Sequence, residues 1–505
     1  MPRIVSVACW LALLPMSPSS LAIAANDATE PNVVFIFADD LGINDLSCYG
    51  RKDQETPRLD RLAAQGMRFT CAYCAQPICS PSRAAVMSGK TPARLHLTTF
   101  LPGRPDCPSQ MLLHPKINMQ LGLEHKTVAE YLKDASYATA CVGKWHLGKA
   151  GFTPSEQGFD FVHAGKANTT PTDDEGGKGE YDLTARAIEF IESNKDRPFF
   201  LYLPHNNPHV PIAAKTELVE KYRDSFNPIY AAMIHTLDDS VGRILDKLDE
   251  LRLTDRTLVI FTSDNGGLHV PELPNTPATH NTPYRAGKGY VYEGGLRIPL
   301  IVRFPGVVPA GKVVDTPVIN TDWLPTILDL CGLKPTAPSP PTPLPRRGEG
   351  SDVSSPFDGI SLTPLLRGGP LPPRPLMWHF PHYTNQGGRP AGAIREGDWK
   401  LIEHYEDNRV ELFHLATDIG ERIDLSAKES SRASDLRAKL AAWRKSVGAQ
   451  MNTPNPNFDP ALHRKLYVDI DTSLLTPDRT AAAMRPKLEA WRAGMDAVVP
   501  RTKEK

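Results

Sequence analysis

The sequence predicts an α/β fold with a central, mostly parallel sheet, and three segments carry this prediction. Pro31–Phe37 is a nearly continuous apolar run, which is typical of a strand buried on both faces. Tyr230–Leu251 repeats apolar residues at helical spacing, and Leu258–Phe261 is a second apolar run bounded by polar residues. Strands that alternate with helices in this way indicate helices packed against a parallel sheet.

Further elements continue the alternation between these segments. Lys126–Ala135 has a helical pattern, and Tyr137–Val142 predicts the strand that follows it. Two more strands are expected at Phe199–Leu203 and Leu300–Phe304. The sheet therefore draws its strands from most of the first 304 residues.

The pattern changes in the last third of the chain. Asp398–Ile402 and Val410–Phe413 are short apolar runs with a polar turn at Glu406–Asn408 between them, which predicts an antiparallel hairpin. Ser431–Val447 has the pattern of an amphipathic helix. Residues 450–505 are polar and weakly patterned, so we expect a tail there.

Composition divides the 505 residues into four parts. Residues 1–25 have the features of a secretory signal peptide, with a basic start, a short apolar run and small residues at the end. Residues 335–356 form a Pro-rich insertion, because six prolines stand between Pro335 and Pro345. An N-terminal domain at 26–334 and a C-terminal subdomain with its tail at 357–505 remain. We expect an exported protein, either periplasmic or secreted.

Charge and cysteine content restrict the partners. The net charge is −1, so no global field points to nucleic acid or to a membrane surface, and no other apolar run approaches a membrane span. Of eight cysteines, Cys9 would leave with the signal peptide. If Cys79 is modified, six remain, which permits disulfides whose connectivity stays open. Cys71 and Cys74 have a C-x-x-C spacing but no second pair that would complete a zinc site.

Oxygen-bearing side chains directly follow two of the predicted strands. Asp39 and Asp40 end the first apolar run, and Asp264 and Asn265 follow the run at Leu258–Phe261. Ligands in open α/β sheets bind beyond the carboxyl ends of the strands, so both pairs are expected at one site. A set of hard oxygen ligands suits calcium or magnesium rather than zinc.

The stretch Cys79-Ser80-Pro81-Ser82-Arg83 combines a cysteine with a helix start. Ser80 is a suitable N-cap, and Pro81 fits the first turn of a helix that continues through Met87. The pattern therefore places Cys79 at a positively polarised helix N-terminus, where an anion is favoured.

Other basic side chains stand in short motifs. Lys144 and His146 lie two apart within Gly143–Gly148, so in extended geometry both project to the same side. His205 and His209 follow the strand at Phe199–Leu203. A further lysine, in Gly287-Lys288-Gly289, has glycine neighbours that permit close approach to an anion.

The string from Cys79 to Gly89 resembles the Cys-x-Pro-x-Arg signature of the type I sulfatases, a family of the alkaline phosphatase superfamily that includes arylsulfatases and N-acetylgalactosamine-6-sulfatases. The resemblance extends from about Pro31 to about Asp424. It implies an alkaline-phosphatase-like sandwich, with residues 26–334 as the catalytic domain and a short antiparallel sheet in the C-terminal subdomain. It also implies hydrolysis of a sulfuric ester.

The resemblance implies a cofactor and a modification. In that family the signature cysteine, here Cys79, is oxidised to Cα-formylglycine by a formylglycine-generating or an anaerobic sulfatase-maturating enzyme. One calcium ion is then expected on residue 79 and the two strand-end pairs, which are Asp39, Asp40, Asp264 and Asn265.

The family also implies roles for five basic residues. Arg83 would stabilise the formylglycine hydroxyl, and Lys144 would contact both the nucleophile and sulfate. His146 would bind the second hydroxyl of the hydrated aldehyde and help expel sulfate. Lys288 would bind sulfate and assist the leaving group. His209 would donate to the ester oxygen, whereas the neighbouring His205 is expected to be structural or peripheral.

The substrate is left open between a sulfated carbohydrate and an aryl sulfate. Two alternative functions remain, a phosphonate or phosphate ester hydrolase of the same superfamily and an inactive carbohydrate-binding relative. Polar residues near the motifs are candidates either for reading a sugar or for surface-loop roles: Arg94, His96, Asn281, Tyr284 and Arg285.

Overall fold

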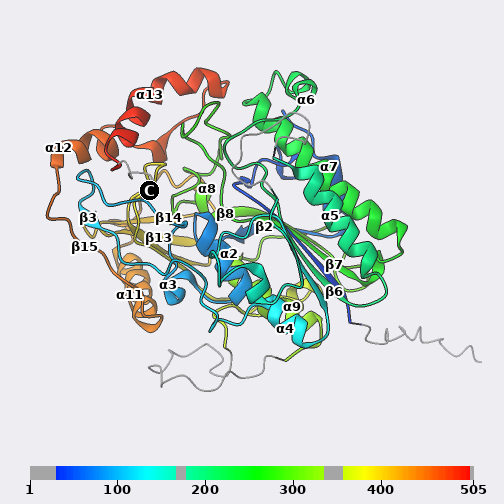
Figure 1. Cartoon of the computed structure of the whole chain (residues 1–505). Coiled ribbons are helices and arrows are strands. Elements are labelled where there is room, and N and C mark those ends of the chain that lie inside the picture. The colour runs from blue at the N-terminus through cyan, green and yellow to red at the C-terminus, as the bar shows by residue number, and fades with distance from the viewer. Residues whose placement is uncertain (1–29, 166–177, 335–355, 501–505) are drawn as a thin grey trace, which may run out of the picture.

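The computed structural model describes residues 30–165, 178–334 and 356–500, and a mixed sheet lies at its centre (Figure 1). The spatial order of its strands is β10 (Val318–Ile319), β2 (Met67–Tyr73), β8 (Arg297–Arg303), β7 (Thr257–Ser263), β1 (Asn32–Ala38), β6 (Phe199–Pro204), β4 (Ala138–Val142) and β5 (Phe161–His163), and β9 (Lys312–Val314) also pairs with β2. The predicted α/β fold with a mostly parallel sheet is confirmed.

Strand direction is uniform in one half of the sheet. The strands β7, β1, β6, β4 and β5 are all parallel, so their carboxyl ends share one edge. The strand expected at Leu300–Phe304 is present as β8, but it runs antiparallel to both β7 and β2. Its direction was not readable from the sequence, because an apolar run has the same pattern in either direction.

Side chains of β1 explain why the sheet is buried on both faces. Val33, Phe35 and Phe37 enter one apolar cluster, and the alternate residues Val34 and Ile36 enter another. One cluster includes side chains of α2 (Cys79–Ser88), α4 (Val128–Asp134) and α9 (Trp323–Leu330), and the other includes those of α1 (Pro57–Gln65), α5 (Glu180–Ser193) and α7 (Pro228–Glu250). The sheet is therefore the middle layer of a sandwich (Figure 1).

A four-stranded antiparallel sheet follows in the order β11 (Leu376–Phe380), β12 (Ala391–Glu396), β13 (Trp399–His404) and β14 (Val410–His414). The expected hairpin is the β13–β14 pair. The predicted amphipathic helix is α11 (Ser430–Ser446), whose Leu436 and Leu440 pack on Leu401 and Leu412. Trp378, Phe380 and Phe413 instead enter the first cluster of the central sheet, so the small sheet is joined to the main core.

The segment expected as a weakly patterned tail contains a buried helix, α13 (Ala481–Ala497). Met484, Leu488, Trp491 and Met495 are buried in the cluster that also contains α7. Their spacing of four, three and four residues is helical, but it stands among charged residues and around Pro486. Besides several single turns of 3₁₀ or π helix, the remaining short helices and strands of the described residues are α3 (Pro92–Leu95), α6 (Thr216–Lys221), α8 (Glu293–Leu296), α10 (Thr363–Leu366), α12 (Pro460–His463), β3 (Leu112–Leu113) and β15 (Thr453–Pro454).

Two expectations fall outside the described residues, namely the signal peptide at 1–25 and nearly all of the Pro-rich insertion at 335–356. Seven cysteines lie in the described part of the chain, and all of them are free thiols. Among the described helices, none is both long and apolar enough to cross a membrane.

A buried ion cluster joins the small sheet to α8, which leads directly into β8 of the central sheet. Lys400 on β13 is fully buried, and its ammonium group lies 2.9 Å from Glu293 of α8 and 2.8 Å from Glu421. Burial raises the pKa of Glu421 to about 7, against the effect of Lys400. Lys400 therefore stabilises two carboxylates that have no access to water. Glu293 is also paired with Arg297 at 3.2 Å, whereas Lys400 is the cation that pairs with Glu421 among the described residues.

We predict that Lys400→Met destabilises the protein strongly. Removing one partner of a buried pair costs about 3–5 kcal/mol, because the Glu421 carboxylate stays buried without its cation. Lys439→Met is the matched control, since its pair with Glu396 is about 40% exposed and such pairs contribute about 0–1 kcal/mol. Thermal unfolding of both variants checks this, and equal midpoints would contradict the role of the buried cluster.

Candidate active site

The carboxyl ends of β1 and β7 bring four oxygen-bearing side chains to one point. Asp39 and Asp40 follow β1 directly, and Asp264 and Asn265 follow β7. The Asp264 amide donates to the Ala38 carbonyl at 3.2 Å, and the Asp40 amide donates to Asp264 Oδ1 at 3.0 Å. These bonds continue the β1–β7 pairing beyond the strands, so each segment holds the other in place.

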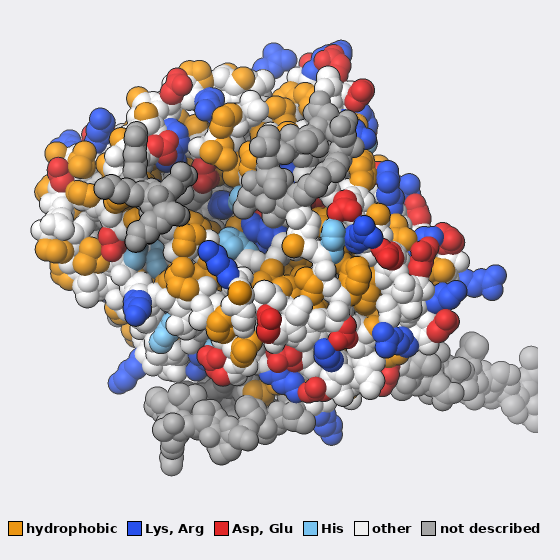
Figure 2. All heavy atoms as spheres, viewed as in Figure 1, with side chains coloured by type: hydrophobic (Ala, Val, Ile, Leu, Met, Phe, Trp, Pro, Cys, Tyr) orange, Lys and Arg blue, Asp and Glu red, His pale blue; other side chains and the backbone are white. Residues whose placement is uncertain are grey.

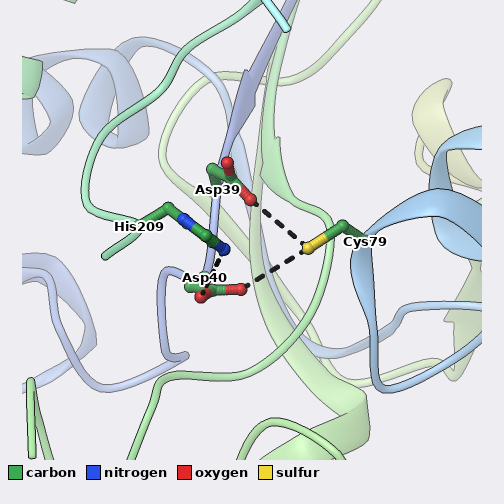
Figure 3. A group of neighbouring side chains, drawn as sticks. All are labelled: Asp39, Asp40, Cys79 and His209. Atoms are coloured by element: carbon green, nitrogen blue, oxygen red, sulfur yellow. Dashed lines mark hydrogen bonds and ion pairs between the residues drawn. The ribbon is translucent and has the colours of Figure 1, made fainter. Parts of the chain in front are cut away.

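Adjacent Asp39 and Asp40 face one centre because the chain leaves the strand between them. Asp40 has a φ of 65°, in the left-handed region, whereas successive strand residues would point to opposite faces. Figure 3 shows both carboxylates directed toward the Cys79 sulfur, with His209 beside Asp40. One ligand atom from each of these four side chains lies within 4.8 Å of the others. The structure thus contains a candidate metal site.

The donor set fits a hard divalent cation. Asp39, Asp40 and Asp264 are buried, with exposed fractions of 1% or less. Asn265 Nδ2 donates to Asp40 Oδ1 at 2.8 Å, which leaves Asn265 Oδ1 buried and without a hydrogen-bond partner among the described residues. Three carboxylates and an unused amide oxygen are ligands that calcium and magnesium prefer. The expected ligands therefore lie together.

Three buried cations offset the three carboxylates. The Lys144 ammonium group lies 2.6 Å from Asp39 Oδ2, and that of Lys288 lies 2.7 Å from Asp40 Oδ2. Arg83 donates to Asp264 Oδ2 through Nε at 3.0 Å and through its terminal nitrogen at 2.7 Å. Figure 2 shows basic and histidine side chains gathered in a hollow near the centre of one face of the molecule.

This mixture of charges shifts the pKa values of the carboxyl groups in different directions. Burial opposes ionisation of Asp39, but nearby Lys144 and His209 hold its pKa well below the usual range. Burial together with the charge of Asp39 raises the pKa of Asp264 to about 7, and burial raises the pKa of Asp40. Burial and the close approach of the three carboxylates thus oppose ionisation of Asp40 and Asp264, even though three cations balance the total charge.

Cys79 is the first residue of α2 and faces the carboxylates. Its sulfur lies 3.6 Å from Asp39 Oδ1 and 3.8 Å from Asp40 Oδ1, and burial raises the pKa of the thiol. The prediction that Ser80 caps the helix was wrong, because the N-cap is Ile78 and Ser80 lies inside the first turn. Ser80 Oγ instead accepts from the Leu101 amide at 3.2 Å, which fixes the loop beside the helix start.

Lys144 reaches the site through a close approach of two chain segments. The Lys144 amide donates to the Pro204 carbonyl at 2.8 Å. Gly143 before it has a φ of 123°, and a Cβ there would lie 1.9 Å from the Pro204 oxygen. Only glycine fits this position without displacing the chain.

His146 lies on the same loop in an unexpected conformation. Its φ is 57°, so the argument from alternating extended residues was wrong, although the ring still lies near Lys144. His146 Nε2 lies 2.9 Å from the Leu101 carbonyl and therefore carries the proton, which leaves the buried Nδ1 as an acceptor without a partner among the described residues. Burial and the charge of Lys144 lower the pKa of His146 to about 3. The ring is a neutral base.

His209 and His205 have different surroundings, as expected. His209 Nδ1 donates to the Val210 carbonyl at 2.5 Å, and its Nε2 lies 3.7 Å from Asp40 Oδ2. Burial, together with Lys288 and Lys144, lowers the pKa of His209 well below the usual value. His205 is fully buried and is hydrogen-bonded to Glu180 instead.

Comparison with known proteins identifies the family. A family model described as Sulfatase matches residues 31–333. The chain belongs to the sulfatase family. It is a sulfuric ester hydrolase, and the sequence resemblance to type I sulfatases is confirmed.

Individual relatives agree with this assignment. The sulfatase is 32% identical to N-acetylgalactosamine-6-sulfatase of Canis lupus familiaris over 472 residues, which covers 83% of this chain and 85% of the relative. It is 34% identical to human arylsulfatase A over 424 residues, covering 75% and 76%. A crystal structure of Ps i-CgsB in complex with k-i-k-neocarrahexaose has 28% identity and a TM-score of 0.69, covering 83% of this chain and 94% of that one.

The residues considered as sugar readers have structural partners in the sulfatase. Arg94 forms an ion pair with Asp358, and the His96 ring lies 2.9 Å from the Gly448 carbonyl. Buried Asn281 donates to the Gly267 and Ala286 carbonyls, Arg285 donates to Ser473 and to the Glu421 carbonyl, and the Tyr284 phenol accepts from Arg297. These contacts favour a role in holding the loops of the protein over a role in binding a sugar, which were the two alternatives that the sequence left open.

Two buried residues of the site region were missed by the sequence analysis. Lys178 is 1% exposed, and burial lowers its pKa to about 8 against the effect of Asp39. Glu180 is fully buried at the start of α5. Neither stands in a motif or at the end of a predicted strand. The only signal was a lysine and a glutamate two positions apart before a helix, which is common on protein surfaces.

We predict that Gly143→Ala reduces turnover far more than Gly151→Ala. A methyl group at 143 would displace Lys144 from Asp39, and a misplacement of about 1 Å costs roughly a hundredfold in rate. Gly151 also has a positive φ, but a methyl group added there would meet no atom within 4 Å, so it controls for backbone strain alone. Hydrolysis of an aryl sulfate by both variants measures this, and similar losses would contradict the need for close approach.

Proposed function

We propose that the sulfatase removes sulfate from a sulfated carbohydrate by means of a formylglycine at position 79 and one calcium ion. The observation that carries this proposal is the position of Cys79 at the first turn of α2, within 4 Å of both Asp39 and Asp40. Lys144 forms an ion pair with Asp39, and Lys288 forms one with Asp40. A nucleophile at residue 79 is thus surrounded by the positive groups that a sulfuryl centre requires.

The proposed calcium ligands are Asp39, Asp40, Asp264, Asn265 and residue 79. Their oxygen atoms and the unpartnered Asn265 Oδ1 support a hard cation. When bound, calcium would polarise sulfuryl oxygens as a Lewis acid. Arg83 keeps the Asp264 carboxylate oriented by two hydrogen bonds and donates a third to the Lys144 carbonyl at 3.0 Å.

The first half of the proposed cycle transfers sulfate to the protein. One hydroxyl of the hydrated aldehyde at residue 79 gives its proton to the Asp39 carboxylate, whose Oδ1 lies 3.6 Å from the Cys79 sulfur, and attacks the sulfur of the ester. The bond between sulfur and the ester oxygen breaks. Lys144 and Lys288 neutralise charge on the sulfuryl oxygens. His209 acts as the donor in its protonated form, which the negative charge of the bound sulfate ester favours. The departing alcohol takes the proton from Nε2, which faces the centre because Nδ1 is bonded to the Val210 carbonyl.

The second half restores residue 79. His146 takes the proton of the remaining hydroxyl through Nδ1, the bond from carbon to the sulfate oxygen breaks, and the aldehyde forms again. The hydrogen bond of His146 Nε2 to Leu101 supports this role, because it leaves Nδ1 able to accept. Sulfate leaves as the anion.

A carbohydrate is favoured as the leaving group by the comparisons. Relatives that are 31–32% identical are named N-acetylgalactosamine-6-sulfatase, and Ps i-CgsB at 28% identity is bound to k-i-k-neocarrahexaose. The relative named arylsulfatase A keeps an aryl sulfate as the second candidate. We further propose export to the periplasm or outside the cell, which is supported by the composition of residues 1–25, and maturation by a formylglycine-generating or anaerobic sulfatase-maturating enzyme.

We predict that residue 79 carries an aldehyde after co-expression with a maturation enzyme, and that Cys79→Ser abolishes turnover. A serine ester lacks the second hydroxyl that expels sulfate, so kcat should fall by at least about a thousandfold. Peptide mass spectrometry and sulfate release measure the two outcomes. Cys48→Ser, at a partly buried cysteine outside the site, should keep full activity.

Either of two results would overturn this assignment. Normal turnover by Cys79→Ser would exclude the formylglycine mechanism. Faster hydrolysis of a phosphonate or phosphate ester than of the matched sulfate ester would favour the alternative hydrolase function, and failure on all esters by an aldehyde-bearing protein would favour the inactive relative.

We predict that chelation lowers both activity and the midpoint of thermal unfolding, and that calcium restores both. A ligand present at a hundred times its dissociation constant stabilises the folded state by about 2.7 kcal/mol. Asp264→Asn should weaken this calcium-dependent stabilisation, because it removes one carboxylate ligand. Restoration by zinc in preference to calcium would contradict the choice of a hard cation and would favour an ion held partly by the His209 nitrogen.

A further inference from the structure

The loop that carries His209 has little regular structure of its own. It runs from His205 to Val210, directly after β6. Its first and third residues bond to the strand beside it, because the His205 amide donates to the Phe37 carbonyl at 2.8 Å and the Asp39 amide donates to the Asn207 carbonyl at 3.0 Å. Those bonds fix the start of the loop, but they do not orient the His209 ring.

The first residue of α5, Glu180, bonds to three residues of this loop. Glu180 Oε1 accepts from the Asn206 amide at 3.0 Å and from the Asn207 amide at 2.9 Å, and its Oε2 is hydrogen-bonded to His205 Nδ1. One carboxylate therefore satisfies three successive residues of the loop. The bonds are fully buried, so water cannot replace them.

Lys178 acts on the other end of the same loop. Its ammonium group donates to the Val210 carbonyl at 2.8 Å, and that carbonyl also accepts from His209 Nδ1 at 2.5 Å. The Lys178 carbonyl accepts from Asn206 Nδ2 at 3.4 Å. The oxygen that determines the orientation of the His209 ring is thus itself held by Lys178.

We propose that Glu180 and Lys178 are positioning residues that hold His209 at the leaving-group side of the site. The inference rests on the proton-donor role proposed above for His209. Neither residue touches a reacting atom in this scheme. Glu180 fixes the backbone before His209, and Lys178 fixes the carbonyl that turns its Nε2 toward Asp40.

The effect of displacing His209 on the rate should depend on which alcohol departs. A sugar alkoxide is a poor leaving group and needs a proton, whereas a nitrophenolate leaves without one. General acid catalysis contributes about 10²–10⁴ in rate where it is needed. Displacement of His209 should therefore lower the rate of hydrolysis of alkyl sulfates and leave that of activated aryl sulfates nearly unchanged.

The experiment compares kcat for N-acetylgalactosamine 6-sulfate, or another sugar sulfate that the protein cleaves, with kcat for 4-nitrophenyl sulfate. We expect Glu180→Ala to lower kcat about a hundredfold on the sugar sulfate and less than about tenfold on the aryl sulfate. Glu180→Gln keeps an acceptor for the two amides and should recover part of the loss. Lys178→Met should show the same selective loss. Glu189→Gln, an exposed glutamate on the same helix, should match the wild type.

A double-mutant cycle with His209→Ala separates positioning from general damage. If Glu180 acts through His209, the double variant is no slower on the sugar sulfate than His209→Ala alone. Equal losses on both substrates, or losses that add to that of His209→Ala, would overturn the inference. If Glu180→Ala does not fold, as judged by thermal unfolding, Glu180→Gln and Lys178→Met carry the same comparison.

Failure of the proposed function gives a different result. If His209→Ala itself slows both substrates equally, His209 is not the proton donor, and the proposed cycle fails whatever the Glu180 variants do. If His209→Ala is selective and neither Glu180→Ala nor Lys178→Met is, only the positioning role fails.

Discussion

The parallel pairing of β1 with β7 and β6 is the constraint on which the site depends. These strands end at the same edge, and the hydrogen bonds continue past them into the loops. Asp264 bonds to Ala38, Asp39 bonds to Asn207, and His205 bonds to Phe37. The metal-site carboxylates and the loop that bears His209 are therefore extensions of one sheet. A change of register by one residue would separate them.

This constraint gathers negative charge, and the rest of the site offsets it. Asp39, Asp40 and Asp264 are all excluded from water, which is costly for unpaired carboxylates. Each cation that balances them comes from a different segment, since Arg83 lies on α2, Lys144 follows β4 and Lys288 lies in a glycine-rich loop. Formation of the site thus requires all these segments to be folded at once. The three positive and three negative charges cancel, so a divalent cation would leave net positive charge for an anionic ester.

The sequence predicted the parts of the site that follow general rules. Asp39 and Asp264 were singled out because they stand at the ends of buried strands. The glycines beside Lys288 allowed an anion to approach, but its role came from the family resemblance. Rules of local geometry were less reliable. Ser80 has the chemistry of an N-cap, but Cys79 already lies in the helix, and His146 has a positive φ that no alternation rule anticipates. The direction of β8 and the burial of α13 depend on tertiary packing, which an apolar pattern alone does not encode.

Lys178 and Glu180 show most clearly why part of a site escapes sequence analysis, since their importance lies in what they contact. Glu180 begins α5, where the positive end of the helix dipole favours a carboxylate. Its side-chain hydrogen bonds all go to a loop that lies at least 25 residues away in sequence. A buried carboxylate with three donors is stable without any role in binding. What gives it significance is that these donors precede His209, and that Lys178 holds the carbonyl to which the His209 ring is bonded. The support that we propose for His209 is therefore visible only when the contacts of its neighbours are followed one step outward.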